Sequence, residues 1–295
     1  MASIRLDVAG NLDDLSGKAV ADYARTLEDL GIECLNTPES WRREPFNTTA
    51  QILAATTRLN AATGIASVYG RDPHAAATAA ENQYADYNGR FTLGLGPTHP
   101  QMVEERGHQW IPPVKKMRPY LQALHLEFEK IPSQSNRPDI MLAANGPRLL
   151  ELARELASGA YSNQMPPAHT KMAREILGPD KIFKPVMQLS LANTEREALD
   201  FAQPAFSFYA ALPAYHRMWN QFGFTESDYT DGGSDALMQA TGAYGNLELI
   251  IGQIHAHIDA GADGVILCPV NHQGAHLGGV QEGLKVLKAI ADELA

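Results

Sequence analysis

Short apolar runs alternate along the chain with longer segments in which apolar residues recur at helical spacing. Because buried parallel strands are short and apolar, the runs predict strands, whereas the longer amphipathic segments predict helices. The expected strands cover residues 4–8, 33–36, 61–66, 91–95, 140–143, 159–163, 186–191 and 263–268. The expected helices cover residues 17–30, 48–58, 72–88, 147–157 and 246–260. Gly31 follows the first helix as a stop signal, and Pro73 can open the third.

This alternation of strand and helix predicts an α/β protein built on a parallel sheet. About eight strand–helix units in 295 residues favour a closed (β/α)8 TIM barrel over an open sheet. Residues 194–245 are too many for one ordinary connection, so we expect them to form a helical insertion before the last strand. We interpret residues 1–295 as a single domain.

The composition narrows the function classes. The chain has 24 Lys+Arg and 34 Asp+Glu, a formal charge of −10, which argues against nonspecific nucleic-acid binding. Two cysteines are too few for a disulfide framework, so we expect a cytoplasmic protein. The first ten residues lack the basic start and long apolar run of a signal peptide, and no apolar run approaches the ~20 residues of a membrane span. A small-molecule substrate is the expected partner.

In such a barrel, the chemistry lies at the carboxyl ends of the strands. One of these ends is in residues 91–99, FTLGLGPTH. Its two glycines are compatible with a dinucleotide-binding loop. However, Pro97 and His99 break the G-x-G-x-x-G pattern of such loops, and the segment is the fourth strand rather than the first. We expect the glycines to let a flat ligand approach the barrel mouth. His99 follows the strand end, either as an exposed loop residue or as a site residue.

A second candidate is the turn AANGPR at residues 143–148, between a strand and a helix. Pro147 suits the first helical turn, and the backbone N–H groups around a flexible Gly146 could bind an anion. We therefore place Ala144, Asn145, Gly146 and Pro147 in a candidate anion site, although an ordinary strand–helix turn has the same pattern. Ser162, after the next strand, could contact the same anion.

The loop after the second strand carries Glu39, Ser40 and Trp41. A carboxylate at a strand end can orient or deprotonate a ligand, although a charged loop is often only solvated. Because exposed tryptophan is uncommon, we expect Trp41 to form a pocket wall. We expect no metal site, since His272 and His276 lie in a glycine-rich tail rather than on a helix.

Several segments in this order and spacing resemble the bacterial-luciferase-like family, specifically its coenzyme F420-dependent oxidoreductases. The segments are TPESWRREPF, ATGIASVYGRDP, NGRFTLGLGPTH, LAANGPRLLELARELASGA, AHTKMAREILGP, YHRMWNQFGFTESDYTDGGSDAL and HIDAGADGVILCPV. The resemblance implies a (β/α)8 barrel, a cytoplasmic location and frequently a homodimer. It also implies hydride transfer at C5 of the deazaflavin ring.

The resemblance assigns roles only where positions match. The positions that border the coenzyme in the family correspond here to Glu39, Gly64, Ile65, Thr98 and Gly146. Glu39 lies near the ring system, and the bond between Gly64 and Ile65 corresponds to a non-prolyl cis peptide behind the ring. Gly146 corresponds to the phosphate-binding turn.

We expect the substrate pocket to include Ser40, Trp41, Tyr69 and His99. The sugar-phosphate dehydrogenases of the family carry histidine at the position of Ser40 and glutamate at that of His99, so the same acid–base pair is not expected here. His99 is the first candidate proton donor because an ordinary histidine titrates near neutrality. Glu39 is the alternative catalytic residue.

Two rival functions remain open from the sequence. One is an FMN-dependent monooxygenase, because FMN would share the phosphate site of coenzyme F420. The other is a cofactor-binding protein without turnover. The presence of His99 and Glu39 at loop ends argues against the second rival.

Overall fold

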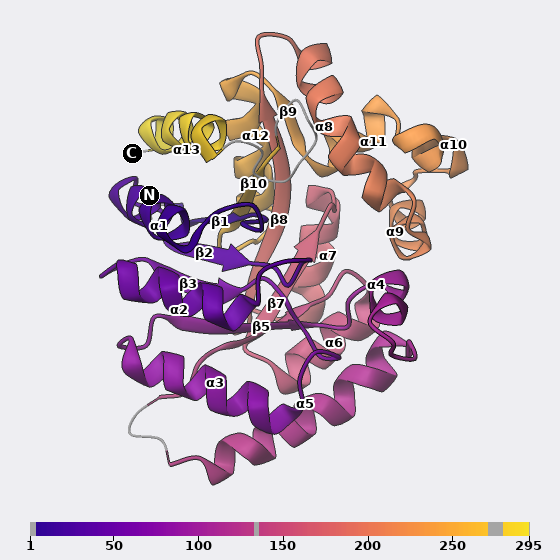
Figure 1. The fold of residues 1–295 in the computed structure, drawn as a ribbon. Coiled ribbons are helices and arrows are strands. Elements are labelled where there is room, and N and C mark those ends of the chain that lie inside the picture. The colour runs from indigo at the N-terminus through magenta and orange to yellow at the C-terminus, as the bar shows by residue number, and fades with distance from the viewer. Residues whose placement is uncertain (1–3, 133–135, 271–279, 295) are drawn as a thin grey trace.

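Eight parallel strands of the computed structural model close into a barrel (Figure 1). The structure describes residues 4–132, 136–270 and 280–294. The barrel strands are β1 (Leu6–Ala9), β2 (Cys34–Thr37), β3 (Asn60–Thr63), β5 (Phe91–Gly96), β6 (Ile140–Ala143), β7 (Gly159–Asn163), β8 (Ile182–Leu191) and β10 (Val265–Pro269). The ring closes because β10 pairs with both β1 and β8. The predicted (β/α)8 barrel is therefore confirmed.

Helices follow the strands and surround the barrel (Figure 1). They are α1 (Gly17–Asp29), α2 (Pro45–Ala55), α3 (Pro73–Asp86), α4 (Pro100–Glu105), α5 (Pro113–Lys130), α6 (Pro147–Leu156), α7 (Pro167–Leu177), α12 (Leu247–Asp259) and α13 (Val280–Leu294). Of these, α4, α5, α7 and α13 were not predicted from the sequence. Pro119 lies inside α5, and an internal proline is normally a sign that a helix ends.

Within the described residues, no helix is long and apolar enough to cross a membrane.

The expected helical insertion lies between β8 and β10. Its helices are α8 (Glu195–Ala210), α9 (Pro213–Trp219), α10 (Glu226–Tyr229) and α11 (Asp235–Thr241). The insertion has an aromatic core, in which the rings of Phe206 and Trp219 stack with centroids 5.6 Å apart. Trp219 Nε1 also donates to the Gln164 carbonyl at 2.9 Å, which anchors the insertion to the loop after β7.

Two short strands extend the sheet beyond the expected eight. The strand β4 (Ala66–Ser67) pairs with β5, and β9 (Ala243–Gly245) pairs with the end of β8. The expectation that residues 243–245 belong to the helical insertion is therefore wrong. Strands of two or three residues are too short to produce a periodic pattern that sequence reasoning could detect.

The barrel interior is filled by residues from strands on different sides of the ring. Ala9, Met141 and Tyr161 come from β1, β6 and β7 and belong to one buried cluster with Ile266 of β10. In strands, alternate side chains point to the same face.

Gly94 and Gly96 serve close packing in this barrel, which corrects the expectation that they leave room for a flat ligand. A Cβ added to Gly94 would lie 1.9 Å from the Thr63 carbonyl oxygen. A Cβ added to Gly96 would lie 2.8 Å from the Ile65 side chain. The space beside both glycines is therefore occupied by the adjoining β3–β4 segment.

Candidate active site

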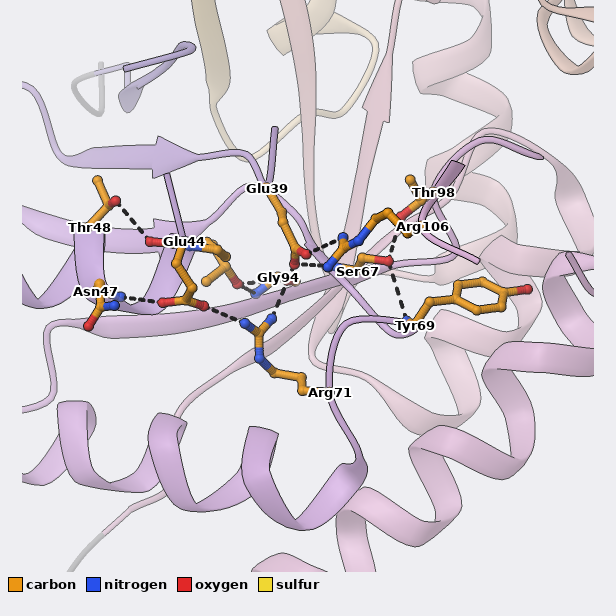
Figure 2. A network of polar contacts seen from close by, with 12 residues as sticks. Glu39, Glu44, Asn47, Thr48, Ser67, Tyr69, Arg71, Gly94, Thr98 and Arg106 are labelled. Atoms are coloured by element: carbon orange, nitrogen blue, oxygen red, sulfur yellow. Dashed lines mark hydrogen bonds and ion pairs between the residues drawn. The ribbon is translucent and has the colours of Figure 1, made fainter. Parts of the chain in front are cut away.

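The loops that follow β2, β4 and β5 are joined by one carboxylate (Figure 2). Glu39 Oε2 accepts hydrogen bonds from the Ser67 backbone N–H at 2.9 Å and from Arg71 Nη1 at 3.1 Å. Glu39 Oε1 accepts from Arg106 Nη1. The Glu39 side chain is only 8% exposed, so its charge is balanced locally by two guanidinium groups. This geometry makes Glu39 a residue that positions three loops.

Arg71 extends this network toward α2. Its Nη2 pairs with Glu44, and its guanidinium carbon lies 4.6 Å from the centroid of the Phe46 ring. Glu44 in turn caps α2 by accepting from the Asn47 N–H at 2.7 Å. Arg71 and Arg106 were not predicted as site residues, because they lie 32 and 67 positions from Glu39. No local motif links such distant residues.

The peptide between Gly64 and Ile65 is cis, as the family resemblance implied. The Ile65 carbonyl accepts a hydrogen bond from the Glu39 N–H at 3.0 Å. A Cβ on Gly64 would lie 2.7 Å from the Asn36 Cβ, so only glycine fits against β2 here. The two residues therefore lie directly beside the Glu39 loop.

The loop of Ser40 and Trp41 is held by Asp13 rather than folded over a pocket. Ser40 Oγ donates to Asp13 Oδ2 at 2.8 Å, and the Trp41 N–H donates to the same oxygen at 3.0 Å. The side chain of Trp41 points to solvent, and the residue is 64% exposed. The expectation that Trp41 forms a pocket wall rather than an exposed side chain is therefore wrong. The hydrogen bonds to Asp13 decide how this loop lies.

Tyr69 and Thr98 both form a hydrogen bond with Ser67. Thr98 Oγ1 donates to Ser67 Oγ at 2.8 Å, and the Tyr69 N–H donates to the same hydroxyl at 3.3 Å. Tyr69 also accepts from the Ile111 N–H through its phenolic oxygen at 2.8 Å. Thr98 has a positive φ of 60°, which turns the chain sharply just before His99.

His99 lies against the helical insertion. The centroid of its ring is 5.7 Å from that of Phe208 on α8 and 6.2 Å from that of Tyr215 on α9. Burial lowers the pKa of His99 below its ordinary value, because an imidazolium loses hydration among these rings. The neutral imidazole therefore predominates at pH 7, which suits a proton acceptor better than the proton donor expected from the sequence.

The candidate anion turn opens α6 without a side-chain cap. Leu149 and Leu150 donate their N–H groups to the Gly146 carbonyl at 3.0 and 3.1 Å, and Pro147 has no N–H to offer. Among the described residues, a Cβ on Gly146 would meet only Met218 Sδ within 4 Å, at 3.8 Å. The space beside this glycine is therefore open.

The other residues of this turn serve mainly to fix its shape. The Ala144 N–H is occupied by the Tyr161 carbonyl at 2.8 Å. Asn145 Oδ1 accepts from the Asn163 N–H at 3.0 Å, and Asn163 Nδ2 donates to the Tyr215 hydroxyl at 3.0 Å. This chain of contacts links the anion turn with Tyr215, one of the two aromatic residues that lie against His99.

Ser162 is 1% exposed, and its hydroxyl has no hydrogen-bond partner among the described residues. The hydroxyl is therefore buried and unpaired among these residues, and its expected contact with an anion stays a prediction. In the part of the chain that the structure describes, no group of three or more His, Cys, Asp or Glu side chains could hold a metal ion. His272 and His276 lie outside the described residues.

The chain is similar in sequence to a known protein family and to curated proteins. The model of the family described as luciferase-like monooxygenase matches residues 2–264. A 5,10-methylenetetrahydromethanopterin reductase of Methanolobus tindarius is 24% identical over 171 residues, which cover 52% of this chain and 52% of that protein. The chain thus spans about half the length of the curated relatives it matches first.

Solved structures share the whole fold. An F420-dependent secondary alcohol dehydrogenase in complex with an F420–acetone adduct has a TM-score of 0.77 at 12% identity, covering 99% of both chains. The oxygenating constituent of 3,6-diketocamphane monooxygenase from the CAM plasmid of Pseudomonas putida, in complex with FMN, has a TM-score of 0.70 at 16% identity. The match covers 99% of this chain and 98% of that chain. Identities this low support the shared fold alone.

Proposed function

We propose that this chain, which belongs to the luciferase-like monooxygenase family, is a coenzyme F420-dependent oxidoreductase that acts on a small organic substrate. The observation that carries the proposal is the link between an open, uncapped turn at Gly146 and the shielded His99 at one end of the barrel. Asn163 and Tyr215 form that link. An anion-binding turn beside a proton-transfer residue is what a phosphate-bearing redox coenzyme requires.

The residues of the turn fit such a coenzyme. Gly146 leaves open space beside the uncapped amino terminus of α6, where a phosphate would be stabilised by backbone N–H groups and the helix dipole. The Ser162 hydroxyl would add a polar contact. When bound, the deazaflavin accepts or donates a hydride at C5. Gly64, Ile65, Thr98 and the loop that Glu39 anchors would border its ring.

His99 would move the accompanying proton. Because its neutral form predominates, an imidazole nitrogen can accept the hydroxyl proton of an alcohol while a hydride leaves the same carbinol carbon and a carbonyl forms. Tyr215, which is itself buried, would limit the access of water to the imidazole. We therefore favour an alcohol–carbonyl pair as the substrate class. The fold neighbour in complex with an F420–acetone adduct is a secondary alcohol dehydrogenase, which agrees with this choice.

Coenzyme choice gives the first test of this function. We expect the purified protein to bind coenzyme F420 more tightly than FMN when both are titrated in parallel by fluorescence. Oxygen uptake with the reduced coenzyme should stay at background, because the deazaflavin reacts poorly with oxygen.

The competing function is an FMN-dependent monooxygenase, which the FMN-bound fold neighbour favours. If FMN binds at least as tightly as F420 and supports oxygen-dependent turnover, the monooxygenase replaces our proposal. Binding of both cofactors without turnover of any alcohol or carbonyl would instead favour a cofactor-binding protein.

We also infer a cytoplasmic homodimer, as the family resemblance implies. The alanine-rich sequence of α3 would allow close approach between helices, but Ala76, Ala77 and Ala80 are already buried in the core of their own chain. Other residues of α3 or neighbouring helices would have to form the contact. Light scattering should give twice the 32.1 kDa of one chain, and a mass of one chain at working concentration would refute the dimer.

A further inference from the structure

A buried histidine lies directly behind the anion turn. His169, in the first turn of α7, is fully buried, and its Nε2 lies 2.7 Å from the Asn145 carbonyl oxygen. Because a carbonyl only accepts hydrogen bonds, Nε2 carries the proton and fixes the tautomer. The rings of Phe183 and Phe222 pack against the imidazole, with centroids 6.2 and 5.9 Å from that of His169. They hold the imidazole in this orientation.

This hydrogen bond fixes the orientation of a whole peptide group, and not only that of its carbonyl. The Asn145 carbonyl and the Gly146 N–H belong to one peptide plane, and in a trans peptide they point in opposite directions. The peptide between them is trans, since the cis bond among the described residues is the one between Gly64 and Ile65. A hydrogen bond that holds the carbonyl toward α7 therefore turns the Gly146 N–H away from α7.

Packing alone does not explain a histidine at this position. Its Nδ1 is buried without a hydrogen-bond partner among the described residues, which is unfavourable for a polar atom. An aromatic hydrocarbon side chain could make the same contacts with Phe183 and Phe222 without that cost. Burial lowers the pKa of His169 to about 4, so near pH 7 the ring is neutral and its Nε2–H remains the donor.

We propose that His169 is a positioning residue for the anion turn. Its hydrogen bond to the Asn145 carbonyl directs the Gly146 N–H at the coenzyme phosphate. This inference rests on the proposed function, because it requires that a phosphate binds at Gly146. His169 touches neither coenzyme nor substrate in this account. It acts through the orientation of a single peptide group.

The test uses ligand pairs that differ in the phosphate. The variant His169→Phe keeps an aromatic ring but removes the donor, whereas His169→Gln restores an N–H donor. We expect His169→Phe to raise the Kd for F420 and FMN about tenfold, the scale of one lost hydrogen bond. The Kd for riboflavin, which is FMN without its phosphate, should change less than about twofold. His169→Gln should recover most of the affinity, and kcat at saturating coenzyme should stay near the wild-type value.

His257 provides a matched control. It is 1% exposed and its pKa is likewise lowered to about 4 by burial, but its Nδ1 bonds to Thr170 Oγ1 at 2.8 Å instead of the turn. His257→Phe should lower the Tm without a selective loss of phosphate-bearing ligands. An equal loss of riboflavin and FMN binding in His169→Phe, or the same selectivity in His257→Phe, would overturn the inference.

Two further results separate this inference from the function it rests on. If the wild-type protein binds riboflavin as tightly as FMN and fails to bind F420, the proposed function fails first and takes the inference with it. If both His169 variants fail to fold, nitrogen NMR of the wild-type protein decides. The His169 Nε2–H resonance should shift on adding FMN and stay in place on adding riboflavin, and an equal shift with both would reject the role.

Discussion

Replacing His99 by alanine should lower turnover by about 100-fold or more, the usual scale for loss of a proton-transfer group. The Kd of the coenzyme should change little, because the proposed phosphate contacts lie at Gly146 on a different loop. The fold should also survive. His99 occupies the N-cap position of α4 but makes no side-chain capping bond there, so the helix loses no hydrogen bond with the imidazole. Stopped-flow absorbance with a confirmed alcohol substrate would measure the change.

The pH profile identifies the form in which His99 works. Its pKa lies below the ordinary 6.5 because burial disfavours the imidazolium, so the base is available throughout the neutral range. In alcohol oxidation, kcat/KM should therefore reach its plateau at a lower pH than an ordinary histidine would give, and fall as the pH drops through the lowered pKa. In carbonyl reduction, which needs the protonated ring, kcat/KM should rise over the same interval. His99→Ala should lose both dependences.

The control is His74→Ala, which removes an exposed histidine that pairs with Glu127 on the outside of the barrel. Its turnover should match that of the wild-type protein. Near-full turnover in His99→Ala would instead assign proton transfer to Tyr69, to Glu39 or to water. A collapse of coenzyme binding would make His99 a coenzyme ligand.

The barrel itself was predictable because its signal is repeated along the chain. Each strand such as residues 140–143 is a short apolar run, and each is followed by a longer segment with helical spacing, so the alternation remains visible when single boundaries are missed. The failures have local causes. The helix α5 contains Pro119, and β9 has only three residues, so neither presents the period on which the prediction depends.

The candidate site was predictable only in part. Strand ends located Glu39, His99 and Gly146, since the carboxyl ends of barrel strands meet at one mouth. The partners of these residues are set by tertiary packing: Arg106 reaches Glu39 across 67 positions, and Phe208 reaches His99 from the insertion. The same packing lowers the pKa of His99 below its ordinary value. A pattern in sequence carries residue type and spacing, but not the burial that shifts a pKa.

Replacing Gly146 by valine should raise the Kd of coenzyme F420 on the order of 100-fold, because losing one or two charge-assisted hydrogen bonds weakens binding by about that much. The backbone of Gly146 has φ −88° and ψ 152°, a conformation that any residue adopts. Its added Cβ would meet only Met218 Sδ among the described atoms, at 3.8 Å. The variant should therefore fold, while its branched side chain occupies the space through which the phosphate approaches the N–H groups of α6.

A graded series makes this expectation specific to the phosphate. Gly146→Ala adds only the Cβ and should weaken F420 binding less than Gly146→Val, whereas riboflavin binding should change little in either. Gly252→Val adds the same bulk on α12, where a Cβ meets no described atom within 4 Å, and should leave both the Tm and the coenzyme affinity near wild type. A folded Gly146→Val protein with unchanged F420 affinity would remove this turn from the binding site, because a phosphate held at the amino terminus of α6 would have to share its space with the isopropyl group.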